Sequence, residues 1–400
     1  MLNLSRGIQS RNENPYQDTK YLSFPIVQGQ NPWLDILRVT AISLVLLRHG
    51  ERSYLQFLDP DHSGSDFISR LLLNGWVGVD LFLVLSGYLI GYGLLRRFNS
   101  ETFKWRPYLR DRILRIVPAY YAVLFAVVLG VFPGYQVSDE QLGFRIAYHL
   151  LFLQDYLTAD INIVFWSLGV EEKFYLLAPI LFAILLRMPT VSITMILLTG
   201  LWLLSPVTKF LISQNWDGNI DYGIFFENFR SPFHATLEPL VVGIAVSYIT
   251  VVTKVEMKIR TAGVVLAVCG IVAALWLGSH NWMSTIGNTD VSIQPAMVSL
   301  LAGVAVWAAI QLATIRPIGE PFWRTISRLS YSLYLVHFPL LPLAHGFTRA
   351  LDIGYLGFWI AYLGLSFYAA LLLHFAVEKP FLLLKVKFKN ISVHSDQIRN

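Results

Sequence analysis

The stretch LDILRVTAISLVLLRHG, residues 34–50, has the composition of a membrane helix, yet it carries charges at both ends. Asp35 and Arg38 lie near its start, and Arg48 and His49 lie near its end. A charged side chain near the centre of a bilayer costs roughly 2.5–3.5 kcal/mol on insertion scales. Because ionisable groups inside a membrane usually belong to a functional site, this stretch predicts both a spanning helix and a site.

The composition of the whole chain supports the membrane assignment. Of its 400 residues, 55% are hydrophobic and only 14% are charged, whereas a soluble protein has about 25% charged residues. The formal net charge of +5 would also suit a nucleic-acid-binding protein. Most basic residues lie in short loops beside apolar segments, however, so we expect no nucleic-acid partner. Cys269 is the only cysteine, which excludes an internal disulfide and a cysteine-based metal cluster.

Ten apolar segments predict an all-α, polytopic membrane protein with about ten transmembrane helices. Several of them approach the ~20 residues that a spanning helix needs. Most of the 31 lysines and arginines fall on the side that holds the N-terminus, so the positive-inside rule predicts that both termini are cytoplasmic. The predicted segments lie near 34–48, 76–95, 114–132, 168–186, 191–212, 235–253, 261–278, 294–315, 329–347 and 355–377.

The domain organisation expected from this pattern is simple. We expect one transmembrane domain over residues 31–383. A flexible cytoplasmic tail is expected at residues 1–30 and a basic cytoplasmic tail at residues 384–400.

The first helix aligns its polar side chains on one face. Arg38 and His49 are eleven residues apart, almost three helical turns, which places them on the same face roughly 16 Å apart along the axis. Asp35 stands three residues before Arg38, the spacing at which opposite charges meet. Arg38 and His49 are too far apart to touch, but they could bind two ends of one long ligand or line one tunnel. The alternative is that Arg48 and His49 only mark the water interface, where arginine snorkels.

A second polar group interrupts the apolar segment WSLGVEEKFYLLAPIL, residues 166–181. Glu171 and Tyr175 share a face at four-residue spacing. One of the carboxylates of Glu171 and Glu172 could pair with Lys173 or with an intramembrane arginine. A structural ion pair or a charged helix start is the alternative interpretation.

A basic segment, RRFNSETFKWRPYLRDRILRIVP, residues 96–118, precedes the third apolar segment. It includes Arg112 and Arg115 in an R-x-x-R spacing, with interleaved aromatic residues. Guanidinium groups match phosphate oxygens in a bidentate way, so this segment favours a polyphosphorylated ligand on the cytoplasmic side. Ordinary positive-inside charge explains most of these residues, but not their density.

Two histidines in other segments are further candidates. His337 lies deep in SRLSYSLYLVHFPLL, residues 327–341, with Tyr334 three residues earlier, and it is either a packing residue or a functional one. His234 and Glu238 form a possible imidazole–acid pair at four-residue spacing. No third ligand stands at helical spacing, so we expect no metal site. The sequence has no Gly-rich phosphate loop, G-x-S-x-G elbow or HExxH motif, which leaves triphosphatase, serine hydrolase and metalloprotease functions unsupported.

Taken in order, the motifs resemble those of the membrane-bound acyltransferase-3 family, integral membrane O-acyltransferases of surface glycans. The resemblance covers about residues 32–383, and six motifs in order are specific although each alone is modest. The matching motifs are LDILR with Arg38 and His49, VGVDLFLVLSGYLI (77–90), Arg112 and Arg115 followed by IVPAYY, WSLGVEEKFYL (166–176), SYSLYLVHFP (330–339) and EKPF (378–381).

The resemblance implies a catalytic set and a fold like the one predicted above. It implies an acyl-coenzyme A donor, usually acetyl-coenzyme A, on the cytoplasmic side and a glycan hydroxyl as acceptor. An alcohol is a poor nucleophile, and His49 is the candidate base that takes its proton. Asp35 and Arg38 would orient or bind the donor, and Glu171 would polarise His49 or bind the sugar.

The same resemblance implies binding residues. Arg112 and Arg115, together with Arg38, would hold the donor, and the expected substrate-binding residues are Trp166, Tyr334 and His337. The donor is a co-substrate, so we expect no permanently bound cofactor.

Some alternatives stay open at this point. A transporter with a proton relay through His49, Glu171 and Lys173 is the rival function, and a non-catalytic lipid- or glycan-binding scaffold is a third. The acceptor could be an exopolysaccharide, a lipopolysaccharide or a lipid-linked glycan, and the acyl group acetyl, succinyl or longer. Direct transfer and an acyl-enzyme both fit the sequence, and the oligomeric state is open. Membrane lipids are expected partners, and a bacterial inner membrane is the expected location.

Overall fold

The structure is a computed structural model, and it describes residues 31–61, 64–216, 220–253, 255–280, 286–385 and 387–388. These residues form helices and no strand, apart from one isolated bridge between Ile220 and Ile286, which confirms the all-α prediction. The tail predicted at residues 1–30 lies outside the described residues, as does nearly all of the tail predicted at 384–400.

The helices fall into long and short elements. The long helices are α1 (Pro32–Phe57), α3 (Val77–Asn99), α4 (Trp105–Val128), α6 (Trp166–Leu185), α7 (Val191–Ser213), α10 (Ile259–Ser279), α11 (Asp290–Gln311), α12 (Glu320–Val336) and α14 (Gly354–Leu373). The short elements are α2 (Phe67–Leu73), α5 (Leu142–Leu150), η1 (Ile163–Phe165), α8 (Tyr222–Ile224), η2 (Phe225–Arg230), η3 (Phe233–Ala235), α9 (Glu238–Tyr248), η4 (Ile249–Thr253), η5 (Phe338–Leu340), α13 (Leu341–Leu351) and η6 (His374–Glu378).

Each of the ten predicted apolar segments overlaps a helix, but several differ in extent, and two of these bear on the site. The ninth, 329–347, is divided into α12 and α13 by the 3-10 turn Phe338–Leu340. Pro339 lies in this turn and has no N–H to donate to a helix. The first segment was predicted to end at residue 48, whereas α1 continues to Phe57.

The extension of α1 changes the position of its second charged group. Arg48 and His49 lie about two turns inside the end of the helix rather than at the end. The acidic residue that follows is satisfied within the protein, because the Glu51 carboxylate accepts hydrogen bonds from Ser69 (2.9 Å) and Tyr355 (2.7 Å). The helix can therefore continue through a polar stretch.

Five helices have the length and hydropathy of a membrane span, so the chain is an integral membrane protein. Helices α1, α4 and α6 are of similar length, with 26, 24 and 20 residues. The five candidate spans are Val77–Asn99, Val191–Ser213, Ile259–Ser279, Asp290–Gln311 and Gly354–Lys385.

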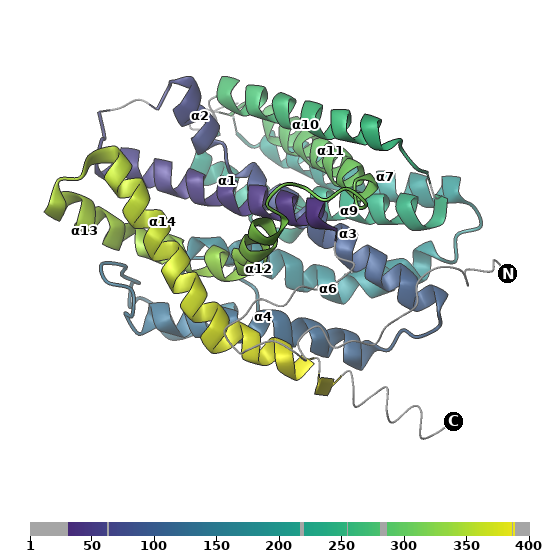
Figure 1. The fold of residues 1–400 in the computed structure, drawn as a ribbon, viewed down its shortest axis with the longest axis horizontal. Helices are drawn as coiled ribbons and strands as arrows, with labels where there is room; N and C mark the ends of the chain where they lie inside the picture. Colours follow the sequence, from purple (N-terminus) through teal and green to yellow (C-terminus); the bar gives the residue numbers. More distant parts are fainter. Residues whose placement is uncertain are drawn as a thin grey trace.

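Helix α1 lies in the middle of the bundle (Figure 1). It packs against α3 and α12, while α10 and α11 lie side by side on one flank. Helices α4 and α14 reach the opposite flank in the same view. Asp35, Arg48 and Glu51 of α1 are buried, so these charged side chains face protein rather than lipid.

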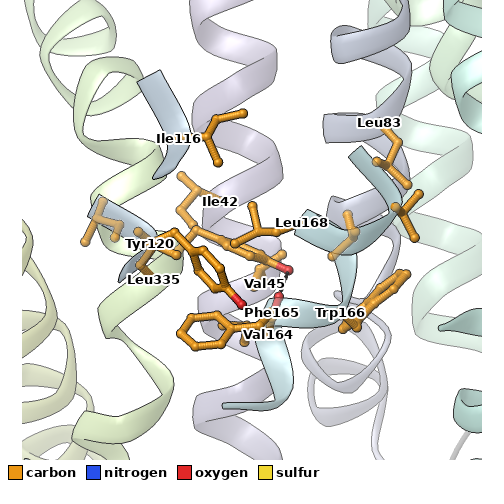
Figure 2. Packing of buried hydrophobic residues seen from close by; sticks show 14 of the residues in the cluster. Ile42, Val45, Leu83, Ile116, Tyr120, Val164, Phe165, Trp166, Leu168 and Leu335 are labelled. Carbon is orange, nitrogen blue, oxygen red and sulfur yellow. Dashed lines mark hydrogen bonds between the residues drawn. The ribbon is translucent and has the colours of Figure 1, made fainter. Parts of the chain in front are cut away.

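An apolar cluster fixes α1 against its neighbours (Figure 2). Side chains from α1, α3, α4, η1, α6 and α12 converge in it. A close-packed interior of this kind restricts the movement of the helices that form it. The polar residues of α1 on either side of the cluster are thereby held in position. The labelled members are Ile42, Val45, Leu83, Ile116, Tyr120, Val164, Phe165, Trp166, Leu168 and Leu335.

Helices α3 and α9 approach each other closely. A Cβ atom on Gly87 would collide with the Leu240 carbonyl, and one on Gly243 would collide with the Val84 carbonyl. Small residues that let backbones meet are typical of helix packing in membranes, where there is no hydrophobic drive to association. This contact anchors α3, which forms walls of the site described next.

Candidate active site

Helix α1 contributes side chains to two cavities. Asp35 and Arg38 line an inner cavity of about 680 Å³. Arg48 and His49 line an outer cavity of about 640 Å³. We call them inner and outer because the N-terminal end of α1 is predicted to be cytoplasmic. The polar face predicted for the first helix therefore lines two cavities.

Asp35 is the centre of a polar network in the inner cavity. It is 7% exposed, and the Ser327 hydroxyl donates a hydrogen bond of 2.7 Å to its Oδ1. Arg38 Nη1 lies 3.8 Å from the same Oδ1, which confirms the predicted ion pair. Arg324 Nε lies 3.9 Å from Oδ2. Two guanidinium groups and a hydroxyl thus fix this carboxylate.

Glu171 lines the same inner cavity. The Tyr175 hydroxyl donates a hydrogen bond of 2.8 Å to Glu171 Oε2, which confirms that the two residues share a face. The Arg112 guanidinium lies over the Tyr175 ring at 5.4 Å, within cation–π range. Arg115 is exposed and also lines the cavity. The structure therefore brings Arg38, Arg112, Arg115 and Glu171 to one chamber.

Lys173 has a different partner from the two predicted carboxylates. Its Nζ donates hydrogen bonds to Asp155 Oδ1 (2.6 Å) and to the Phe152 carbonyl (2.7 Å). The predicted pairing of Lys173 with Glu171 or Glu172 is therefore wrong. Burial raises the pKa of the Asp155 carboxyl, and Lys173 opposes that shift. Residues one or two positions apart on a helix do not face each other, and the partner of Lys173 comes from the preceding loop instead.

His49 in the outer cavity is held by His337. The distance from His49 Nδ1 to His337 Nε2 is 2.9 Å, and the two rings stack with centroids 5.1 Å apart. His337 is fully buried and does not belong to the lining of either cavity. It lies behind His49 and supports that ring.

Hydrogen-bond valence assigns the tautomers of this neutral pair. His337 Nδ1 lies 3.0 Å from the Leu333 carbonyl, which only accepts, so Nδ1 carries the proton. His337 Nε2 is then an acceptor, and His49 Nδ1 must donate to it. This leaves the lone pair on Nε2 of His49. A neutral imidazole with a free Nε2 in a cavity is a ready general base.

Arginines and aromatic rings form much of the rest of the outer cavity. Arg48 lies over the Tyr222 ring at 4.5 Å, and Arg52 lies over it at 4.9 Å. Arg230 lies between the rings of Trp76 (5.0 Å) and Trp166 (5.2 Å). The predicted binding residue Trp166 is thus a wall of this chamber.

Tyr334 and Val79 line both cavities and form the wall between them. The Tyr334 hydroxyl donates to the Val164 carbonyl at 2.8 Å. Because that bond uses its hydrogen, Ser167 Oγ at 2.7 Å donates to the Tyr334 oxygen. Two hydrogen bonds to η1 and α6 therefore lock this side chain of α12 in place.

Hydrogen bonds and an ion pair hold the segment 145–160, which precedes η1. Arg145 Nε lies 2.6 Å from Asp160 Oδ2, and the Tyr148 hydroxyl donates to Asp160 Oδ1 at 2.6 Å. His149 Nδ1 donates to the Arg145 carbonyl at 2.8 Å, and burial lowers the pKa of His149 to about 4. Val164 of η1, which accepts from Tyr334, is thereby tied to this loop.

The predicted pair of His234 and Glu238 does not form. Glu238 Oε1 accepts a 2.5 Å hydrogen bond from Lys209, and both side chains are buried. The His234 ring stacks on Tyr156 instead, with Nδ1 at 3.2 Å from the tyrosine hydroxyl. The helix begins only at Glu238, so four-residue spacing did not put the two side chains on one helical face. Over the described ranges, no group of three or more His, Cys, Asp and Glu side chains could hold a metal ion.

Several cavity residues were not among the predicted site residues. Arg52, Tyr222 and Arg230 line the outer cavity, and Arg48 was considered only as an interface residue. Arg52 stands three residues after His49 on the same helix face, a spacing that would have revealed it had α1 been predicted at its full length. Tyr222 and Arg230 come from a segment with no periodic pattern.

Comparison with known proteins places this geometry in a family. The sequence pattern of the family described as "Acyltransferase domain" matches residues 31–375. The chain is 25% identical to "Regulator of hypoxia-inducible factor 1" of Caenorhabditis elegans, over 87% of this chain and 78% of that protein. It is 24% identical to "Peptidoglycan O-acetyltransferase OatA" of Listeria monocytogenes, over 83% of this chain and 52% of that protein. The chain thus spans about half the length of OatA. No solved structure matches the chain.

Proposed function

The chain belongs to the acyltransferase family and is an O-acyltransferase by class, and on that premise we propose that it moves an acetyl group from cytoplasmic acetyl-coenzyme A to a glycan hydroxyl on the opposite side of the membrane. The main support for the proposal is that α1 lines two cavities. The outer cavity contains the candidate base His49, and the inner cavity contains arginines. The full proposal includes ten membrane spans, both termini in the cytoplasm and location in a bacterial inner membrane.

The inner cavity is the proposed donor site. Arg112 and Arg115 lie on α4, in the part of that helix that belongs to the basic segment 96–118, and would hold the coenzyme phosphates at the cytoplasmic mouth. Arg38 lies deeper and is oriented by Asp35 and Ser327. A guanidinium fixed in this way loses little entropy when a ligand binds.

The outer cavity is the proposed place of chemistry. The acceptor hydroxyl oxygen attacks the thioester carbonyl carbon while His49 Nε2 takes the hydroxyl proton. The carbon–sulfur bond then breaks, and the proton on His49 passes to the departing thiolate. The products are an ester and free coenzyme A. An acyl-enzyme on His49 is the competing route.

The remaining predicted residues then have distinct roles. His337 is a positioning residue, because its fixed tautomer directs the lone pair of His49 away from it. Trp166 offers a ring face to a sugar in the outer cavity. Glu171 is proposed to act on the donor side, because it lines the chamber of Arg38 rather than that of His49.

The wall of Tyr334 and Val79 lies between the proposed donor and acceptor. The pantetheine arm of coenzyme A is long and thin, and we propose that it passes this wall while the nucleotide stays inside. Arg38 and His49 are separated by roughly 16 Å along α1, a distance that such an arm can bridge. Finding the nucleotide and the acyl group on the same face of the wall in a bound structure would end this part of the proposal.

The test uses the purified protein in nanodiscs with acetyl-coenzyme A. Thiol release is measured with and without a crude surface-glycan extract, for the wild type, His49→Ala and the exposed Arg187→Gln as a matched control. We expect glycan-dependent release that falls by at least about 100-fold in His49→Ala, the usual contribution of a general base. Arg187→Gln is expected to behave as wild type.

The other outcomes discriminate between the functions considered. Release that persists in His49→Ala would mean that another group is the base. Absence of coenzyme binding in the wild type would favour the transporter with a proton relay. Coenzyme binding that is unchanged in His49→Ala would confirm that the variant is folded and that its defect is chemical.

A further inference from the structure

We propose that the acceptor carries a negative charge, a carboxylate or a phosphate, beside the hydroxyl that is acylated. The inference rests on the proposed function and specifies its substrate class. Its starting point is the charge of the outer cavity, whose lining includes four arginines and no aspartate or glutamate within the described part of the chain. These arginines are Arg48, Arg52, Arg230 and Arg349.

One of the four arginines is already neutralised. Arg230 donates to both carboxylate oxygens of Asp80, at 2.6 and 2.8 Å, and both side chains are buried. This ion pair holds α3 against η2, the segment that ends at Arg230. Arg349 lies at the exposed rim and donates to the Phe57 carbonyl at 2.6 Å.

Arg48 and Arg52 keep their charge for a ligand. Arg48 is only 3% exposed, and one of its amino groups donates to the Leu73 carbonyl. Its other amino nitrogen, Nη2, is buried with no hydrogen-bond partner among the residues that the structure describes. Such a group is costly unless a partner arrives, because a buried donor without an acceptor keeps the full cost of desolvation.

The nearby carboxylates do not compensate these two charges. Glu51, next to Arg52 in the sequence, is buried and accepts hydrogen bonds from Ser69 and Tyr355 instead. Asp80 is engaged by Arg230. Within the described ranges, no ion pair joins Arg48 or Arg52 to a carboxylate, and their common contact is the face of Tyr222.

The position of the arginines places the anion close to the reacting hydroxyl. Arg52 follows His49 by three residues, so it lies on the same face and about 5 Å further along the axis, close to one turn. The rings of Trp166 and Tyr222 line the same chamber and give it an apolar wall beside the arginines. An acidic sugar or a sugar phosphate fits this arrangement, with the hydroxyl at His49 and the charge at Arg48 and Arg52.

The experiment compares matched acceptors on the full-length protein in nanodiscs. The probes are methyl glucuronide, which carries a carboxylate, methyl glucoside 6-phosphate, and neutral methyl glucoside. Binding is measured by titration calorimetry without donor, and thiol release is measured with acetyl-coenzyme A. Both are repeated for Arg52→Gln, Arg52→Glu and the exposed control Arg187→Gln.

We expect the anionic probes to bind at least tenfold more tightly than methyl glucoside, with an advantage that falls as salt rises. Arg52→Gln should remove most of that advantage, Arg52→Glu should reverse it, and Arg187→Gln should retain it. A preference for one anion over the other distinguishes an acidic sugar from a sugar phosphate as the source of the charge.

Failure of the inference and failure of the proposed function give different results. Equal binding and equal reaction of neutral and anionic probes would overturn the inference while leaving the transferase intact. Anion binding without thiol release from any acceptor, the crude glycan extract included, would overturn the proposed function and the inference with it. If Arg52→Gln instead weakens coenzyme A binding, the outer arginines hold the donor and the inference is wrong.

Discussion

The inner and outer cavities are both lined by arginines, but among the described residues only the inner cavity is also lined by carboxylates. In the inner cavity Arg38 lies 3.8 Å from Asp35, and Glu171 contributes a second carboxylate. In the outer cavity Arg48 and Arg52 stack on Tyr222, and no carboxylate of the described residues lines the chamber. A carboxylate beside an arginine holds the guanidinium group in one orientation. An arginine without a carboxylate partner has no counter-charge in the protein, and a ligand can supply it.

This difference matches two kinds of substrate. The proposed coenzyme donor would be the same molecule in every turnover, so an arginine that is oriented in advance would suit it, with extra charge at the mouth. The proposed acceptor would enter a cavity whose lining, over the described ranges, includes arginines without carboxylates, and the electrostatic attraction of these arginines would speed its association. Substitutions confined to one cavity should therefore affect one substrate and leave the other unchanged.

The largest effect in this comparison is expected at the mouth of the inner cavity. The double variant Arg112→Gln/Arg115→Gln should raise the KM for acetyl-coenzyme A by about 100-fold, because each charge-assisted phosphate contact contributes about 1.5–3 kcal/mol. Steady-state thiol release measures this change. A short thioester without the nucleotide should react equally with the wild type and the variant, and a loss with that short donor would contradict the assignment.

A smaller effect is expected behind the outer cavity. His337→Ala removes the acceptor for His49 Nδ1 and should lower kcat by about tenfold, the equivalent of one hydrogen bond. The pH profile of kcat should also shift, because the tautomer of His49 is no longer fixed. His337→Gln offers a carbonyl oxygen at a similar position and should recover part of the rate. An unchanged pH profile in His337→Ala would reduce its role to packing.

The smallest effect concerns stability on the outer side. The pKa of His149 is about 4 in the folded protein, below its ordinary value of 6.5, so the folded state favours the neutral ring. The stability that this ring supports is fully present above pH 6.5 and is lost as pH falls toward 4. We expect the melting temperature to fall by a few degrees between pH 7 and pH 5.

A matched variant separates this effect from general acid denaturation. The amide of His149→Gln can donate to the Arg145 carbonyl as the imidazole does, but it does not titrate. The variant should show a smaller decrease in melting temperature over the same pH range. An identical decrease in both proteins would assign the acid sensitivity to other groups.

Contacts within one helix were predictable from the sequence. Asp35 with Arg38 and Glu171 with Tyr175 follow from helical spacing alone, and both form. The spacing of Arg38 and His49 also placed them correctly on a shared helix. Periodicity is a local property, so it is reliable where both partners lie on the same helix.

Contacts between helices were not predictable in this way. His49 and His337 are 288 residues apart, and Arg230 and Asp80 are 150 residues apart. Only the packing of α1 against α12, and of α3 against the segment that ends at Arg230, brings these groups together. The predicted end of the first helix was also wrong, because the Glu51 carboxylate, which follows residue 48, is satisfied by distant partners such as Tyr355.

The wall that Tyr334 and Val79 form between the two chambers has an electrical consequence. In the proposed reaction an acyl group moves outward past this wall and a hydroxyl proton moves inward to the thiolate, while the phosphates of the donor stay where they are. An acyl cation equivalent is thus exchanged for a proton, and no net charge crosses. The membrane voltage should then neither drive nor oppose turnover. The protein would modify a molecule on one side of the membrane without reducing the membrane potential.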